Sequence, residues 1–247
     1  MTGNAARIEG GEYNHIVNVL RLKEGDEIAL CLNDGLDRAA RIAKIDKKHL
    51  TAAILKTEEN RAESPLNCAL FQALVKGDKL EFIAQKATEL GVKRIVPFVS
   101  AFTTVKPETA RTGRLQAACI EAAKQCGRAR TPEIDHVLGF KEAVAALKAY
   151  SCVIFPYENE RERSIIDAIE TVKSGNADCM VPCPPDVSRS VAVVIGGEGG
   201  FSDAEAEELK AVGAAACSLG KRILRAETAA VVATGIVMNA LERLAEH

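Results

Sequence analysis

Residues 191–205 read VAVVIGGEGGFSDAE, in which five apolar residues lead into four glycines interrupted by one glutamate. The apolar, β-branched run is typical of a central strand in a parallel sheet, because such strands are buried on both faces. Ser202 followed three residues later by Glu205 is a capping box, so a helix is expected to begin there. The glycines between them therefore form a loop at the carboxyl end of a strand, where open α/β sheets bind ligands.

The four glycines of this loop leave bare backbone that a ligand can approach closely. A dinucleotide-binding loop would need a third glycine where Ser202 stands, and a phosphate-binding loop would need a Gly-Lys-Ser/Thr sequence that this stretch lacks. The carboxylate of Glu198 would also repel phosphate. The loop therefore suits a ligand that carries positive charge or hydroxyl and amine donors.

A second candidate loop lies in residues 218–244, SLGKRILRAETAAVVATGIVMNALERL. Gly220 ends a short predicted strand, a basic and apolar segment follows, and Glu227 opens a helix that is apolar on nearly every side. A helix of this kind must be covered on more than one face. We expect the core of the fold to cover one face and a partner subunit to cover another.

The first 62 residues follow a different pattern. The segments DEIALCL, DRAARIAKI and HLTAAILKT alternate apolar and polar positions, with NDGLD and DKK as turns, which predicts a small β-barrel. Before them, NHIVNVLRL has helical spacing that places Ile16, Val19 and Leu20 on one face. The polar, proline-containing stretch TEENRAESP marks a domain boundary.

From residue 66 onward strands alternate with helices, which predicts an α/β fold with a parallel sheet covered on both faces. Residues 174–190 contain three prolines and no periodicity, so we expect a long surface connection there. Strands are expected at 68–75, 94–99, 151–156, 191–196 and 215–219, and helices near 78–90, 110–127, 140–149, 164–173, 203–212 and 227–244.

Composition limits the possible functions. The net charge of −2 and the isoelectric point near 6.2 provide no overall field that would attract nucleic acid, so any such contact must come from local basic patches. The chain has no apolar run long enough to span a membrane and no secretory signal at its start, so the cytoplasm is the expected location. Its eight cysteines include no Cys-x-x-Cys pair, and Cys179 with Cys183 would supply only two thiolates, so no metal site is expected.

Five motifs carry a resemblance to a known family: HIVNVLRLKEGD at 15–26, GDKLEFIAQKATELGVKRIVPFVS at 77–100, EAAKQCGRARTPEI at 121–134, IGGEGGFSDAE at 195–205 and LGKRILRAETAA at 219–230. In this order and spacing they resemble the RsmE-type 16S ribosomal RNA uridine N3-methyltransferases of the SPOUT superfamily. The resemblance implies a PUA-like, RNA-binding β-barrel in residues 1–62 and a SPOUT methyltransferase domain in residues 66–247. It further implies a trefoil knot that holds S-adenosyl-L-methionine, a homodimer, and 16S rRNA as the substrate. We expect this RNA in the assembled small ribosomal subunit, with free RNA as the alternative.

The same resemblance assigns roles to residues. Arg225 would stabilise negative charge on the uracil oxygens, and Glu227 is the candidate acceptor of the N3 proton, with bulk water as the alternative. Glu198 would lie near the cationic methyl donor. The residues expected to contact RNA are His15, Arg21, Lys124, Arg128 and Arg130. The cofactor would bind to Gly196, Gly197, Glu198, Gly199, Gly200, Leu219, Gly220, Ile223 and Leu224, together with the loop FPYE at 155–158, and backbone groups of Leu219, Ile223 and Leu224 would hold its adenine.

Structural alternatives stay open for several of these residues. Glu198 could be a solvated turn residue, Arg225 could cap the helix or pair with Glu227, and the basic residues could complete a helix C-terminus. A NAD-binding dehydrogenase and a non-catalytic RNA-binding assembly protein are the alternative functions. Two departures from the family pattern bear on these expectations. Gly197 stands where the family has proline, which is expected to loosen the loop, and no arginine-and-aromatic strand precedes Ala6, so an incomplete barrel is expected.

Overall fold

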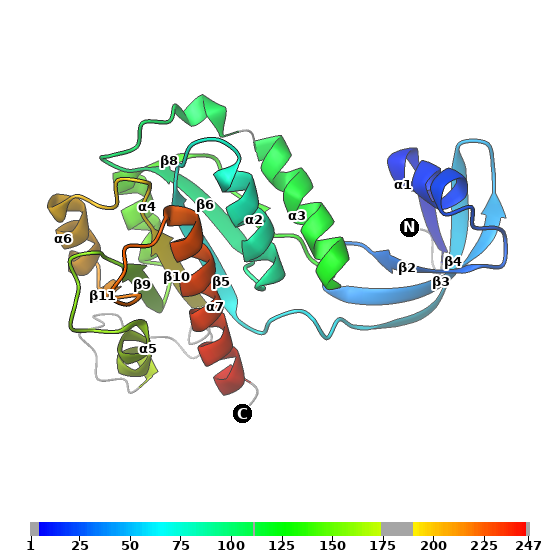
Figure 1. Ribbon diagram of the computed structural model, residues 1–247. Helices are drawn as coiled ribbons and strands as arrows, with labels where there is room; N and C mark the ends of the chain where they lie inside the picture. Colours follow the sequence, from blue (N-terminus) through cyan, green and yellow to red (C-terminus); the bar gives the residue numbers. More distant parts are fainter. Residues whose placement is uncertain (1–4, 111, 174–189, 246–247) are drawn as a thin grey trace. The chain divides into compact units, whose positions relative to one another are not determined.

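The computed structural model describes residues 5–110, 112–173 and 190–245, which form two compact units (Figure 1). The first unit holds the residues up to Glu63 together with residues 127–130, and the second holds the remainder. The domain boundary expected from the sequence puts residues 127–130 in the second domain. They belong to the first unit because the Asn60 side chain donates to the Gly127 carbonyl at 2.9 Å, and the Glu63 carboxylate accepts from the Arg130 backbone N–H at 2.8 Å.

The first unit is a four-stranded antiparallel sheet in the order β1-β4-β3-β2. Its strands are β1 (Ala5–Glu9), β2 (Glu27–Cys31), β3 (Leu36–Ile45) and β4 (His49–Glu59). The sequence analysis placed no strand before the first helix, but β1 pairs with β4 along its whole length, from Ala5 opposite Ala53 to Glu9 opposite His49. An apolar core of Ile16, Ala40, Ile42, Leu50 and Ala52 covers one face of this sheet.

The segment after β1 forms a short helix that loosens into a π-helical turn. Helix α1 (Gly10–Asn14) runs into η1 (His15–Val19), where the Leu20 N–H donates to the His15 carbonyl at 2.9 Å, a spacing of five residues. The expected apolar face is therefore wrong beyond Ile16, because the wider turn rotates the later side chains away from the sheet. Ile16 is buried, whereas Val19 and Leu20 are 61% and 53% exposed.

The second unit is built on a parallel sheet in the order β11-β9-β10-β5-β6-β7, with β8 also pairing with β6. The five predicted strands are confirmed within two residues, and the two-residue strands β7 and β8 were not predicted. The strands are β5 (Asn67–Ala73), β6 (Arg94–Val99), β7 (Glu133–Ile134), β8 (Leu138–Gly139), β9 (Cys152–Pro156), β10 (Ser190–Ile195) and β11 (Ala215–Cys217).

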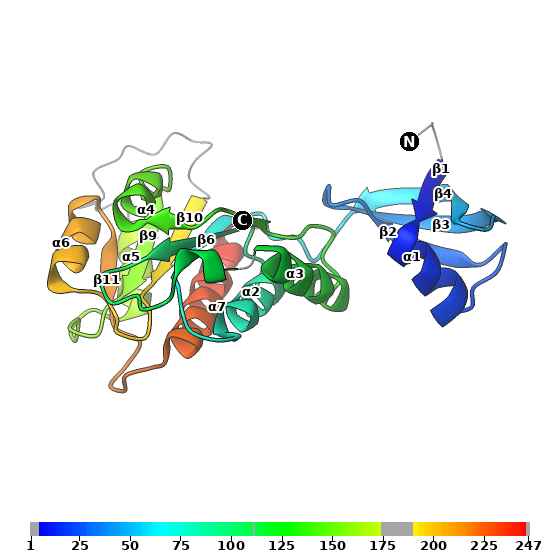
Figure 2. The same ribbon diagram turned by 90° about the horizontal axis from the view of Figure 1, so that it is seen from above.

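Helices cover both faces of this sheet, as expected (Figures 1 and 2). Successive residues of β10 alternate between two apolar cores, with Val193 in the core on one face and Val194 in the core on the other. The six predicted helices are also confirmed within two residues. They are α2 (Lys79–Glu89), α3 (Thr112–Cys126), α4 (Phe140–Leu147), α5 (Ile165–Lys173), α6 (Asp203–Ala211) and α7 (Ala226–Ala245), with a short 3-10 turn η2 at Pro107–Thr109.

Two further expectations concern membrane spans and the connection before β10. Among the helices of the described ranges, none is both long and apolar enough to cross a bilayer. Nearly all of the connection expected at 174–190, with Cys179 and Cys183, falls outside the described residues.

Candidate cofactor site and basic residues

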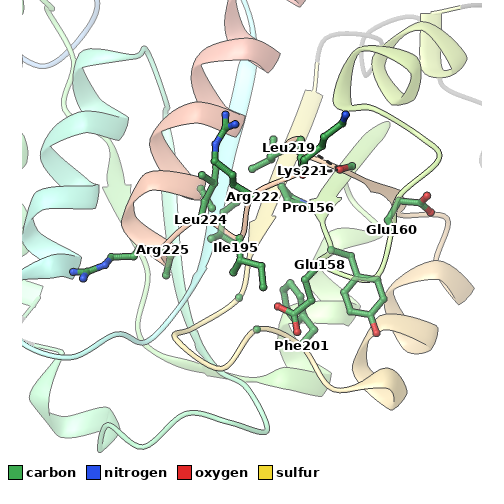
Figure 3. Close-up of a pocket in the computed structure, with 18 of the residues that line it drawn as sticks. Pro156, Glu158, Glu160, Ile195, Phe201, Leu219, Lys221, Arg222, Leu224 and Arg225 are labelled. Carbon is green, nitrogen blue, oxygen red and sulfur yellow. Dashed lines mark hydrogen bonds between the residues drawn. The ribbon is translucent and has the colours of Figure 1, made fainter.

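A cavity of about 910 Å³ lies where three neighbouring strands of the parallel sheet end (Figure 3). Its walls are the loops that follow β9, β10 and β11, with Lys79 at the start of α2 and Ala226 at the start of α7. These loops meet because β11, β9 and β10 are adjacent and parallel, so their carboxyl ends share one edge. The two loops singled out from the sequence are therefore two walls of one cavity.

The glycine loop after β10 is a tight turn whose backbone leaves no room for side chains. The Gly200 N–H donates to the Gly197 carbonyl at 3.1 Å, and Gly200 has a φ of +67°. A Cβ at Gly196 would stand 3.0 Å from the Gly200 backbone, and a Cβ at Gly200 would stand 2.6 Å from the Glu158 carboxylate. Both positions line the cavity. Gly196 requires glycine for space because its neighbour is backbone, whereas Gly200 favours glycine because of its positive φ, since the Glu158 side chain could move aside.

Gly199 has a structural role in this loop. It does not line the cavity formed by the described residues, and a Cβ there would lie 2.6 Å from the Cβ of Phe102. Glycine is needed at this position because the loop packs against the Phe102 ring. The contact of Gly199 with the cofactor stays a prediction, since this residue is not part of the described cavity wall.

Gln72, on the neighbouring strand β5, supports the glycine loop and was not among the predicted site residues. It is fully buried in β5, level with Ile195 of β10. Its Nε2 donates to the Ala73 carbonyl at 2.9 Å and reaches the Gly196 carbonyl at 3.4 Å, and its buried Oε1 has no hydrogen-bond partner in the part of the chain that the structure describes. A single polar residue within the apolar strand CALFQALV was the available signal.

Glu198 is not a free carboxylate. Its Oε1 accepts a hydrogen bond from Lys79 Nζ at 2.9 Å and another from the Lys76 backbone N–H at 3.2 Å. Burial opposes ionisation of Glu198, but the Lys79 ammonium and the Lys76 N–H outweigh it, so the pKa of Glu198 lies below its usual value. Lys79, also missed from the sequence, stands 3.9 Å from Glu227 Oε2 and so contacts the glycine loop and the start of α7 together.

The two candidate catalytic residues are not paired with each other. Arg225 is exposed and forms no ion pair with Glu227 or any other described residue, and Figure 3 shows its side chain extending away from the other labelled residues. The Arg225 carbonyl accepts the Ala229 N–H at 2.8 Å, so only its backbone takes part in starting α7. Glu227 does not line the cavity itself, and its Oε2 is buried without a hydrogen bond among the described residues.

The loop after β11 supplies an apolar wall with unused backbone donors. Leu219, Gly220, Ile223 and Leu224 all line the cavity, and Ile223 is 87% exposed. The turn is fixed by the Gly220 N–H, which donates to the Ser218 hydroxyl at 3.2 Å. The N–H groups of Ile223 and Leu224 find no acceptor within the described residues. Such a wall can hold a flat, polar-edged ring.

Arg128 is unavailable for the RNA contact expected of it. Its side chain is 2% exposed and lies 3.1 Å from Glu63 Oε2, so it completes a buried ion pair within the first unit. The Arg130 guanidinium is more accessible, although its Nη2 donates to the Asp34 carbonyl at 2.7 Å. The other candidates, Lys124, His15 and Arg21, are exposed, and Lys124 lies 3.5 Å from Glu121.

The chain matches two protein families. Residues 62–238 match the RNA methyltransferase domain family, and residues 8–55 match the PUA domain of RNA methyltransferases. Ribosomal RNA small subunit methyltransferase E of Bacillus subtilis (strain 168) is 33% identical over 242 residues, which cover 96% of this chain and 91% of the relative. The enzyme of the same name from Mycobacterium bovis is 31% identical, with coverage of 96% and 87%.

Solved structures with a bound cofactor share this fold. The ribosomal RNA small subunit methyltransferase E of Neisseria gonorrhoeae, bound to S-adenosyl methionine, aligns with a TM-score of 0.79 and 28% identity over 99% of this chain and 93% of that one. A Legionella pneumophila methyltransferase in complex with the same cofactor aligns with a TM-score of 0.76 and 31% identity over 96% and 93%.

The buried ion pair makes a prediction about stability. Arg128→Met should lower the free energy of unfolding of the first unit by about 3–5 kcal/mol, because it strands the largely buried Glu63 carboxylate without its cation. Urea denaturation measures this loss. Arg130→Met is the matched control and should cost under about 1.5 kcal/mol, since an exposed guanidinium loses one hydrogen bond to a carbonyl. Equal, small losses in both variants would show that Arg128 is not a structural residue.

Proposed function

We propose, from the premise that this chain belongs to the ribosomal RNA small subunit methyltransferase E family, that it transfers a methyl group from S-adenosyl-L-methionine to N3 of a uridine in 16S ribosomal RNA. Family membership accounts for the enzyme class and sets aside the NAD-binding alternative. The observation that carries the site assignment is the cavity at the ends of β9, β10 and β11, where the glycine loop faces the loop after β11.

The residues of the cavity fit this cofactor. A volume of about 910 Å³ is within the usual size of a small-molecule site. The free N–H groups of Ile223 and Leu224 can hold the edge of the adenine, the side chains of Leu219 and Leu224 can cover its faces, and the bare backbone at Gly196 and Gly200 admits the rest of the molecule. The bound cofactor would supply an electrophilic methyl group on a sulfonium. Gln72 holds the Gly196 carbonyl in place beneath it.

The chain's own residues would then position the uracil and accept its proton. Orienting the two reactants can supply on the order of 7–11 kcal/mol of the barrier reduction. Glu227 stays the candidate acceptor of the N3 proton, with bulk water as the alternative, because its Oε2 has no hydrogen bond to another described residue although Lys79 Nζ lies 3.9 Å away. We propose that Arg225 stabilises the negative charge that develops on the uracil oxygens, since its guanidinium is exposed and unpaired among the described residues.

The remaining proposals concern the substrate and the assembly. We propose that the first unit binds RNA, with His15, Arg21 and Arg130 as candidate phosphate contacts and without Arg128. Lys124 belongs to the second unit and is a separate candidate phosphate contact. We place the protein in the cytoplasm, where small ribosomal subunits are assembled, and take the assembled subunit as the substrate. The trefoil knot implied by the family also stays a proposal.

The function is tested on ribosomes. Small subunits from a strain that lacks this protein should gain 3-methyluridine in 16S rRNA when incubated with the purified protein and S-adenosyl-L-methionine, measured by mass spectrometry of digested nucleosides. Methylation at another base position would overturn the N3 assignment. Binding of the subunit without methylation would favour the non-catalytic assembly role.

We predict that the protein is a dimer built partly on α7. Three apolar side chains of this helix are only half-buried in the single chain, those of Val231, Val232 and Ile236. A second subunit that covered this apolar face would stabilise a dimer. Sedimentation at micromolar concentration should show twice the mass of the 26.4 kDa chain. A monomer that still methylates RNA would contradict this prediction, whereas Ile236→Glu should convert the dimer to monomers.

We predict that Arg225→Ala slows methyl transfer at saturating RNA by roughly two to three orders of magnitude, equivalent to about 2.7–4 kcal/mol. The affinity for S-adenosyl-L-methionine should stay close to that of the wild type, because the charge that Arg225 meets arises only during the reaction. Single-turnover kinetics measure the rate, and Arg222→Ala, in the same loop, is the control. A wild-type rate for Arg225→Ala once RNA is saturating would reduce Arg225 to an RNA anchor.

A further inference from the structure

Four carboxylates line the cavity, and the structure separates them by their partners. They are Glu158, Glu160, Glu162 and Glu198. Glu198 accepts hydrogen bonds from Lys79 Nζ and from the Lys76 backbone N–H. The Glu160 carboxylate accepts the backbone N–H groups of Glu162 and Arg163 at 2.9 and 3.1 Å, so it holds its own loop together. Neither of these two side chains is free to meet a positively charged ligand without breaking contacts it already has.

Glu158 also lines the cavity, but it differs from Glu160 and Glu198 because its carboxylate has no partner among the described residues. Its carboxylate forms no hydrogen bond or ion pair with any described residue. It lies against the glycine loop, where its two oxygens are 2.6 and 3.1 Å from the position of a Cβ at Gly200. Because Gly200 has no side chain, this exposed carboxylate can lie against the backbone of the glycine loop. Glu162 also lacks a side-chain partner among the described residues, but no glycine of the loop has it as a neighbour.

Five basic side chains also line the cavity: Lys79, Arg161, Lys221, Arg222 and Arg225. Lys79 is paired with Glu198, and Arg161 comes from the same loop as Glu158. Lys221 and Arg222 come from the loop after β11, and neither has an ion-pair partner in the described part of the chain. Figure 3 shows them at one end of the labelled residues, with Glu158 and Phe201 at the other. A ligand with a positive centre would be repelled by the first end and attracted by the second.

We propose that Glu158, and not Glu198, is the carboxylate that recognises positive charge on the cofactor. The inference rests on the proposed cofactor site and deepens it. Glu198 instead forms an ion pair with Lys79, which holds the glycine loop against α2. Two cationic groups of S-adenosyl-L-methionine could meet Glu158, the sulfonium and the α-ammonium, and the chemistry required of the side chain is the same for either.

The test is isothermal titration with three ligands that differ in charge. S-adenosyl-L-methionine carries both cations, S-adenosylhomocysteine keeps only the ammonium, and 5′-methylthioadenosine carries neither while sharing the adenosine. Glu158→Gln should lower the affinity for S-adenosyl-L-methionine by about tenfold, as expected for loss of one charge-assisted contact, and leave the affinity for 5′-methylthioadenosine unchanged. If the affinity for S-adenosylhomocysteine also falls, Glu158 contacts the ammonium. If only the affinity for S-adenosyl-L-methionine falls, Glu158 contacts the sulfonium.

Matched variants separate this role from damage to the fold. Glu162→Gln, from the same loop, should weaken binding of S-adenosyl-L-methionine much less than Glu158→Gln does, and Glu198→Gln should shift all three affinities by a common factor because it loosens the glycine loop. Glu158→Asp keeps the charge and should bind S-adenosyl-L-methionine more tightly than Glu158→Gln does. An equal loss for all three ligands in Glu158→Gln, or a charge-selective loss in Glu198→Gln, would overturn the proposal. If the wild type binds none of the three, the cofactor site itself is wrong, a result that the variants cannot mimic.

Discussion

The close approach of backbone to backbone in the glycine loop is the constraint on which the site depends. Gly196 packs against Gly200, and Gly200 in turn leaves space for the Glu158 carboxylate. At Gly200 a side chain would strain the backbone, which has a φ of +67°. At Gly196 a side chain would meet the Gly200 backbone and displace the loop after β10. Because β9 and β10 are neighbours in the sheet, that displacement would widen the cavity at its centre. The bare backbone thus sets the shape of the site before any polar group contributes.

The ammonium group of Lys79 contacts two acidic side chains around this loop. Lys79 belongs to α2, yet its Nζ contacts Glu198 of the glycine loop and approaches Glu227 at the start of α7. It therefore ties three elements that are far apart in the sequence. All three side chains are partly buried, so their interaction is screened less than that of a surface pair. By neutralising one carboxylate and leaving another free, this arrangement decides which acidic side chain can act on a ligand.

Periodicity and local motifs predicted the elements of the second unit well because each element's signal is local. The β-branched run of β10 and the capping box of Ser202 and Glu205 both formed as expected, with the Ser202 N–H donating to Glu205 Oε2 at 2.9 Å. The first unit was harder to predict. Strand β1 is stabilised by pairing with β4, more than forty residues away, and the π-helical turn that exposes Val19 depends on how Ile16 packs on the sheet.

The sequence by itself determined the order of strands and helices of the second unit, the two loops that line the cavity and the family to which the chain belongs, since these follow from neighbouring residues. Only the tertiary structure decided the partners of the charged side chains. Arg128 resembled a phosphate ligand in the sequence but is buried against Glu63, and Glu198 resembled the free carboxylate of the loop but is held by Lys79. A charge is free or neutralised according to what the fold brings within a few ångströms of it, and those groups come from distant parts of the chain.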